Sequence, residues 1–116
     1  LGTDRELCDT GFVVGEERVR LTAVGAIVAV QSAPLRRLIF GEPRRSGEDI
    51  EVRHCSPGAF SCLLEYLHSG RLRLAEDVSV LEVALLADFY MVDGLRRRCS
   101  ELLLEPLREE AEGAAE

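Results

Sequence analysis

Apolar and polar residues are arranged along the first third of the chain as they are in two strands followed by a helix. Thr10–Val14 is rich in β-branched and aromatic residues, Arg18–Leu21 alternates apolar with polar side chains, and the GEE between them suits a hairpin turn. Leu21–Val30 has no charged residue and predicts a buried helix. Gly25 within that stretch is expected to weaken the helix by about 1 kcal/mol relative to alanine.

A serine cap and an amphipathic pattern predict a second helix directly after the first. Ser32 precedes Ala33–Phe40 and is a suitable N-cap residue. Leu35, Leu38 and Ile39 share one face of this helix, which makes it amphipathic.

The next segment predicts a charged loop, a short strand and a long helix. Gly41–Asp49 holds two glycines, one proline and five charged residues, so it is a loop by composition, and Ile50–Val52 is a short strand. Ser56 is a suitable cap, and Pro57 suits the first turn of a helix that is expected to end at Gly70. The apolar stripe of that helix is formed by Phe60, Leu63, Leu64 and Leu67.

Two further helices complete the predicted elements. Ser79 and Glu82 have the spacing of a capping box, and Val80–Tyr90 is apolar nearly all round, which indicates a central helix rather than a surface one. An amphipathic helix begins at Asp93 and is expected to end at Pro106. The resulting order of two strands, two helices, one strand and three helices is that of an α+β domain.

Composition narrows the class of protein further. With 116 residues, of which 47% are hydrophobic, the chain suits one globular domain, which we place at residues 1–104. Residues 105–116 are acidic and are expected to form a frayed tail. The net charge of −7 argues against direct nucleic-acid binding. The longest uncharged run, Leu21–Leu35, is shorter than the roughly 20 apolar residues that a membrane crossing needs.

The cysteines and histidines do not form a recognisable metal site. Four cysteines without C-x-x-C spacing predict free thiols in a reducing compartment, which is the cytoplasm or the nucleus. Cys62 and His68 are six residues apart on one expected helix and point about 120° apart, which disfavours a shared zinc ion. Cys99 follows three arginines, which favour a reactive thiolate, but its helical spacing from Leu95 favours burial instead.

Catalytic patterns are missing from the sequence. The segment GEPRRSG departs from a phosphate-binding loop, because five residues separate its glycines and no lysine follows. The sequence has no G-x-S-x-G, no nucleophile paired with a base and no clustered carboxylates. We therefore expect a non-enzymatic binding module with no cofactor, metal ion or small-molecule substrate.

Two long stretches resemble the BTB/POZ family. Leu85–Leu103, LLADFYMVDGLRRRCSELL, resembles the family signature L-x-x-A-D-x-Y-x-v-x-x-L-x-x-x-C-x-x-x-L, and Ser56–Leu74 resembles its P-x-a-F-x-x-l-L segment. Cys8–Glu17 is similar to the opening hairpin of the family, and Ala26–Ser32 stands where the family has V-L-A-A-x-S. The resemblance covers roughly Leu7–Leu103.

The resemblance implies an α+β BTB/POZ fold, with a small mixed sheet of about three strands packed against five or six helices. Most of the matching residues are then expected to belong to the core rather than to a binding surface. The residues expected in the core on this ground are Leu85, Ala87, Tyr90, Leu95 and Cys99.

The resemblance also implies a dimer interface near the first helix. Gly25 stands where the family usually has a basic residue that pairs with the acid at Asp9, and an unpartnered buried carboxylate is costly. We therefore expect Asp9 to lie near solvent, or to pair with Arg18 or Arg20. Because this helix lies near the twofold axis of family dimers, Asp9, Val24 and Gly25 are the predicted dimer contacts.

The first functional hypothesis is an adaptor for a cullin-3 ubiquitin ligase. The family's cullin contacts cluster at the helix LRRLIF, at the loop after it and at the end of the helix YLHS. In the apolar-x-Glu motif of that loop, Arg45 replaces the glutamate, whereas Phe40–Glu42 has the right chemistry three residues earlier, and His68 replaces a frequent tyrosine. The predicted protein interface comprises Leu35, Leu38, Phe40, Glu42, Pro43, Arg45 and His68.

The second hypothesis is an oligomerisation module of a BTB transcription regulator, which pairs with itself or with another BTB chain and recruits corepressors. The expected partners are therefore cullin-3 or another BTB chain, with a homodimer as the expected assembly. Neither hypothesis involves a membrane. Since the chain carries no kelch repeat or zinc finger, the sequence names no substrate.

Overall fold

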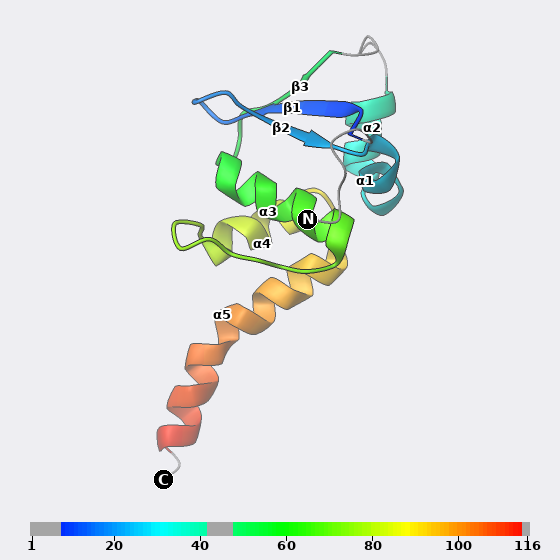
Figure 1. The fold of residues 1–116 in the computed structure, drawn as a ribbon. Coiled ribbons are helices and arrows are strands. Elements are labelled where there is room, and N and C mark those ends of the chain that lie inside the picture. Colours follow the sequence, from blue (N-terminus) through cyan, green and yellow to red (C-terminus); the bar gives the residue numbers. More distant parts are fainter. Residues whose placement is uncertain (1–7, 42–47, 115–116) are drawn as a thin grey trace.

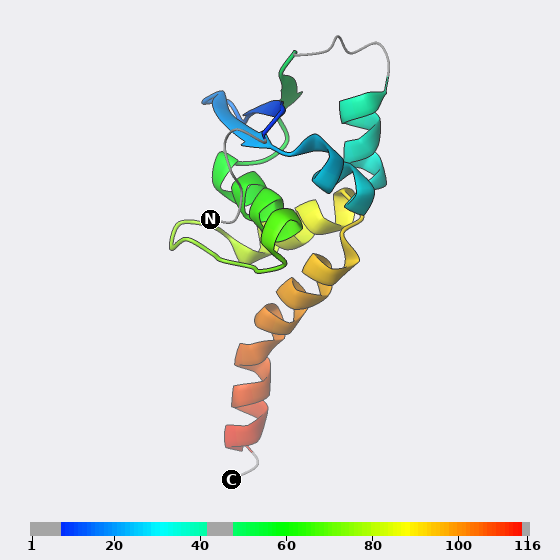
Figure 2. The same ribbon diagram turned by 45° about the vertical axis from the view of Figure 1, so that its right-hand side comes forward.

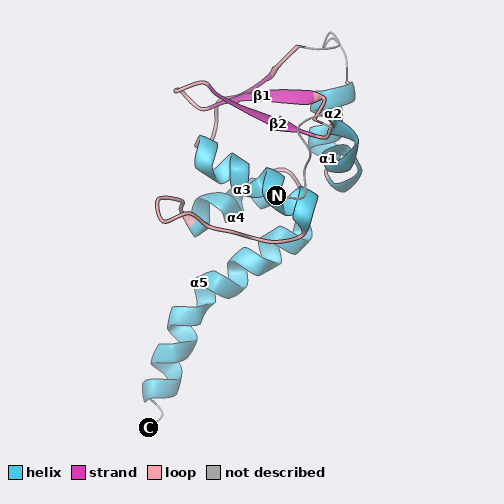
Figure 3. Cartoon of the chain, viewed as in Figure 1, coloured by secondary structure: helices cyan, strands magenta, loops and turns pink. Residues whose placement is uncertain are grey.

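The computed structural model describes residues 8–41 and 48–114, with side chains through residue 104 (Figure 1). Within these residues, three strands and five helices form the α+β fold that the sequence predicts. Figure 3 distinguishes the helices from the strands by colour. The elements are β1 (Thr10–Val14), β2 (Val19–Ala23), α1 (Gly25–Gln31), α2 (Ala33–Phe40), β3 (Ile50–Val52), α3 (Pro57–Ser69), α4 (Val80–Phe89) and α5 (Asp93–Ala114).

The sheet is mixed, as expected. Its strand order is β2-β1-β3, with β1 antiparallel to β2 and parallel to β3. Val14 pairs with Val19 across the hairpin, and Gly15 provides the positive φ of 74° with which the turn begins. A glycine at this position avoids the Cβ clash that the left-handed region imposes on other residues.

The start of α1 differs from the prediction. The sequence suggests a helix from Leu21, but Leu21–Ala23 pairs with β1 as part of β2, and the helix begins only at Gly25. Gly25 therefore does not interrupt a helix. It permits a close approach instead, because a Cβ atom at this position would lie 2.6 Å from Thr10 Oγ1.

The elements form layers around α3 (Figures 1 and 2). The sheet lies on one side of α3, α4 and the first half of α5 lie on the other, and α1 and α2 form a pair at one end. Aromatic rings cross these layers: the ring centroids of Phe12 and Phe60 are 5.1 Å apart, and those of Phe60 and Tyr90 are 5.9 Å apart. One continuous core therefore joins the sheet to the helices.

Serine caps start three helices as predicted. The hydroxyl oxygens of Ser32, Ser56 and Ser79 each accept a hydrogen bond from the backbone N–H three residues later. The reciprocal half of the predicted capping box is wrong, however. The Glu82 carboxylate accepts from the Ser56 N–H at 2.7 Å and from the Ser56 hydroxyl at 2.9 Å, and so connects the starts of α3 and α4.

The C-terminal ends of α4 and α5 differ in how well the sequence marks them. Helix α4 ends in a Schellman motif, in which Val92 N–H donates to Ala87 O and Met91 N–H donates to Asp88 O. Met91 takes the left-handed position with a φ of 59°, where glycine is usual. Helix α5 was expected to end at Pro106 but continues to Ala114, because an internal proline removes one hydrogen bond without necessarily ending a helix. Figure 1 shows its C-terminal half extending away from the other elements.

Candidate protein-interaction surfaces

The junction between β2 and α1 is held by the Asp9 carboxylate. Asp9 Oδ1 accepts a hydrogen bond from Gly25 N–H at 2.8 Å and from the Thr10 hydroxyl at 2.9 Å. Gly25 is the first residue of α1, where unpaired N–H groups and the helix dipole favour a negative charge. Asp9 thus caps a helix that begins sixteen residues later.

Arg18 and Arg20 form ion pairs on the sheet. Asp9 was expected either to lie near solvent or to pair with one of these arginines, and it is exposed, in agreement with the first alternative. Arg18 pairs with Glu51 at 3.0 Å, and its hydrogen bond lowers the pKa of that carboxyl. Arg20 pairs with Asp49 at 3.0 Å, which raises the pKa of the arginine. Both pairs lie on the exposed surface, where water and salt screen them and their contribution to stability is small.

His68 completes this junction from α3. Its Nε2 accepts a hydrogen bond from Val24 N–H at 3.1 Å, and its Nδ1 lies 2.7 Å from Leu64 O. The tautomer that carries the proton on Nδ1 satisfies both contacts. Both ring nitrogens therefore act within the chain, whereas the sequence assigns His68 to a partner.

The end of α2 carries part of the predicted protein interface. Leu35 is fully buried and offers no side-chain surface to a partner. Leu38 and Phe40 are exposed, and Phe40 retains 65% of its accessible surface. Glu42, Pro43 and Arg45 lie outside the described residues. Among the predicted contacts with described side chains, Leu38 and Phe40 are thus the exposed apolar ones.

The outward face of α4 was not predicted from the sequence. Val83, Leu86 and Ala87 face the core, as expected of a central helix, but Leu85 is exposed, so its assignment to the core is wrong. Four large apolar residues on α4 and just after its end have accessible fractions between 56% and 62%. We call these four residues the α4 outer row. The α4 outer row consists of Leu81, Leu85, Phe89 and Met91.

An aromatic pair extends the α4 outer row. The ring of His54 lies against that of Phe89, with centroids 4.8 Å apart. Behind them, the buried Tyr90 hydroxyl is 3.2 Å from His54 Nε2, and burial raises the pKa of Tyr90. The tyrosine therefore stays protonated, and it donates to the imidazole in the tautomer whose Nε2 carries no proton. This contact holds His54 beside Phe89 at the surface.

The thiols are free, as predicted. Cys55, Cys62 and Cys99 are buried, and burial raises the pKa of each, that of Cys55 to about 11. Cys99 is therefore a buried core thiol rather than a reactive one, although three exposed arginines precede it. Among residues 8–41 and 48–104, no three potential metal ligands gather at one place. No helix in this part of the chain combines the length and the apolar character of a membrane-crossing segment.

Comparison with known proteins identifies the family. The BTB/POZ domain profile matches residues 2–107. The chain belongs to the BTB/POZ family. BTB/POZ domains are protein–protein interaction modules that mediate oligomerisation and contacts with partners.

Two relatives and two solved structures are similar to this BTB/POZ domain. The Leucine-zipper-like transcriptional regulator 1 homolog of Drosophila melanogaster is 30% identical over 120 residues, which cover 79% of this chain and 12% of that protein. BTB/POZ domain-containing protein 19 of Bos taurus is 33% identical over 100 residues, which cover 85% of this chain and 34% of that protein. The chain thus spans about a third or less of the length of these relatives.

The solved structures support the same assignment of fold. The BTB domain of human Gigaxonin superposes with a TM-score of 0.69 at 26% identity, over 84% of this chain and 79% of that one. The BTB domain of zebrafish PATZ1 superposes with a TM-score of 0.66 at 21% identity, over 83% of this chain and 75% of that one. The predicted α+β BTB/POZ fold is therefore confirmed.

Proposed function

We propose that this domain is the cullin-3-binding module of a ubiquitin-ligase adaptor. The exposed apolar surface formed by Phe40 and the α4 outer row carries the proposal. The family resemblance assigns cullin contacts to the helix that ends at Phe40. In a longer protein, of which this chain is one part, another domain would hold the substrate.

A hydrogen bond links the start of α2 to the end of α4, so one partner can reach both helices. The Ser32 hydroxyl, which caps α2, donates to Tyr90 O at the end of α4 at 2.6 Å. Helix α2 has eight residues, so Phe40 lies about 12 Å along the helix from that contact. A protein partner typically buries about 800 Å² on each side, enough to cover both helices. Burying a leucine or phenylalanine fully is worth roughly 1.5–3 kcal/mol, and several such residues together offset the entropy lost on association.

A calorimetric titration of the cullin-3 N-terminal domain into the chain tests this proposal. We expect one cullin per chain with micromolar or tighter affinity, and a loss of about tenfold or more in Phe40→Glu and Phe89→Glu, because each places a charge in an apolar contact. Val30→Glu, on the exposed face of α1, is the matched control and should bind as the unaltered chain does. Absence of heat with the folded chain would refute the proposal.

A second candidate function is self-association, or pairing with another BTB chain, in a transcription regulator that recruits corepressors. The observation that favours it is the exposed apolar face of α1, where Ile27 and Val30 lie three residues apart and Val30 is 83% exposed. Val24, predicted as a dimer contact, directly precedes this helix.

Sedimentation equilibrium separates the two candidates. If α1 forms the twofold interface, the chain should have a dimer mass, and Val30→Arg should reduce it toward that of the monomer. Phe89→Glu should leave the dimer mass unchanged, since Phe89 belongs to the α4 outer row. A monomer mass for the unaltered chain at about 100 µM, well above the range of ordinary affinities, would exclude homodimerisation.

A further inference from the structure

A pocket of about 450 Å³ lies between α3, the segment that follows it and the first turns of α5. Arg71 and Arg73 reach it from the segment, Arg98 from α5 and Tyr66 from α3. No acidic residue lines this pocket. The chain has a net charge of −7, so three guanidinium groups around one hollow form a positively charged patch on a negatively charged protein.

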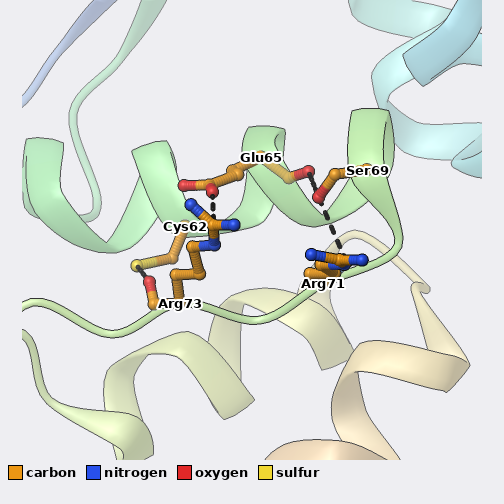
Figure 4. Close-up of polar contacts among 5 residues, drawn as sticks. All are labelled: Cys62, Glu65, Ser69, Arg71 and Arg73. Atoms are coloured by element: carbon orange, nitrogen blue, oxygen red, sulfur yellow. Dashed lines mark hydrogen bonds and ion pairs between the residues drawn. The ribbon is translucent and has the colours of Figure 1, made fainter. Parts of the chain in front are cut away.

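The backbone that carries the two neighbouring arginines is fixed in place (Figure 4). The Ser69 hydroxyl accepts a hydrogen bond from Arg71 N–H at 3.1 Å, and Cys62 Sγ donates to Arg73 O at 3.2 Å. Leu72, between the arginines, packs against the core. Because side chains alternate along an extended segment, this anchoring directs both arginines outward. The backbone that carries both arginines is thus fixed in place before any ligand arrives.

The ion pairs of these arginines are weak enough to be exchanged. Arg73 Nε is 3.6 Å from Glu65 Oε1, and Arg98 Nη1 is 3.1 Å from Glu101 Oε2. Both arginine side chains are more than half exposed, so water and salt screen these pairs. The Arg71 side chain has no hydrogen bond or ion pair with any residue that the structure describes. A stronger anion can therefore recruit all three guanidinium groups.

A second hollow provides a contrast. It has a volume of about 460 Å³ and lies beside the β2–α1 junction, but its lining combines Arg20 with the Asp9 carboxylate. An anion entering there would meet a negative charge, and Arg20 is already paired with Asp49. No carboxylate lines the arginine-lined pocket, and Arg71 brings to it a side chain without an ion pair among the described residues.

We propose that the pocket formed by Tyr66, Arg71, Arg73 and Arg98 binds a phosphorylated side chain of a peptide segment in a partner protein. A phosphoryl group carries nearly two negative charges and three acceptor oxygens, which match several guanidinium forks and a phenol hydroxyl. A carboxylate has two oxygens and one charge, so it uses fewer of these donors. None of these residues belongs to the α4 outer row, so phosphopeptide binding is independent of the cullin proposal.

An NMR titration of the chain with acetyl-Gly-Gly-phosphoserine-Gly-Gly tests the proposal. The amide resonances of Tyr66, Arg71, Arg73 and Arg98 should shift together on addition of this peptide. Peptides with serine or glutamate in place of phosphoserine, and inorganic phosphate, serve as matched probes. The phosphopeptide should bind more tightly than all three, and its affinity should fall as salt concentration rises.

Variants of single charges determine whether the pocket is responsible. Arg71→Ala and Arg98→Ala should each weaken phosphopeptide binding by about tenfold, which is the loss of one charge-assisted contact. Glu65→Gln should tighten it by about two- to threefold, because it removes the competitor for Arg73. Arg96→Ala, an exposed arginine of α5 outside the pocket lining, is the matched control.

Three outcomes would overturn the proposal. The first is unchanged affinity in both Arg71→Ala and Arg98→Ala, with circular dichroism showing that they remain folded. The second is a set of shifted resonances that lies outside the pocket. The third is binding of inorganic phosphate or the serine peptide as tight as that of the phosphopeptide, which would leave no role for a phosphorylated peptide.

Discussion

The β2–α1 junction and the α4 outer row differ in whether their surface groups already have partners within the chain. At the junction, the N–H groups of Val24 and Gly25 donate to His68 and Asp9, so polar groups that a partner could have used already have acceptors within the chain. In the α4 outer row, Leu85 and Phe89 remain largely exposed. The comparison indicates that polar groups with partners inside the chain stabilise the fold, whereas exposed apolar surface is available for association.

The largest expected effect contrasts the two faces of α4. Leu86→Ala should lower the free energy of unfolding by about 2–5 kcal/mol, because Leu86 is buried and its loss leaves a cavity. Leu85→Ala, one residue away, should change it by less than about 0.5 kcal/mol. Urea denaturation followed by circular dichroism measures both. Equal losses would mean that Leu85 is covered in solution by another part of the chain or by a second copy.

The next effect tests the close approach at the junction. Gly25→Ala should destabilise the domain by about 1–3 kcal/mol, because the new methyl group would clash with Thr10 Oγ1. Ala26→Ser, at the exposed neighbouring position, is the control and should lie within about 0.5 kcal/mol of the unaltered chain. A stabilised Gly25→Ala variant would show that helix propensity outweighs the packing of this junction.

A smaller effect isolates the cap that Asp9 provides. Asp9→Ala should lower the unfolding free energy by about 1 kcal/mol, since Gly25 N–H loses its acceptor at the start of α1. Asp9→Asn should lose less, because the amide oxygen can still accept that hydrogen bond. Thermal unfolding at low ionic strength compares the two. Equal losses in both variants would assign the effect to charge rather than to the hydrogen bond.

The smallest effect has the opposite sign. Met91→Gly should raise the unfolding free energy by up to about 1 kcal/mol, because glycine accepts the left-handed conformation that Met91 adopts with φ 59°. Met91→Ala removes the same side chain but retains a Cβ, so it should give no such gain. If the α4 outer row binds cullin-3, both variants should lower that affinity. Calorimetry alongside urea denaturation would separate binding from stability at one residue.

Elements whose ends are marked by local chemistry were predictable from the sequence. The serines that cap α2, α3 and α4 and the glycine that ends α3 with a φ of 76° act within a few residues of their own position. The start of α1 was not predictable in this way, because it depends on pairing of Leu21–Ala23 with β1 and on a carboxylate sixteen residues earlier. Contacts between distant residues decide that boundary.

The exposed face of α4 escaped prediction for a related reason. The helix is apolar nearly all round, so periodicity does not show which side faces solvent. Glu82, whose charge would ordinarily mark the solvent side, turns to Ser56 instead. Leu38 and Phe40, which the family resemblance assigns to the protein interface, are exposed, and so is Leu85, which the same resemblance placed in the core.

The carboxylate of Glu82 has a consequence for how the domain opens. It belongs to α4 but satisfies the first turn of α3, so fraying of either helix start breaks a hydrogen bond of the other. The two helices are thereby coupled into one cooperative unit, whose amide protons would exchange with solvent at a common rate set by a shared opening. The first turns of α3 and α4 are therefore expected to open in one event rather than one helix at a time.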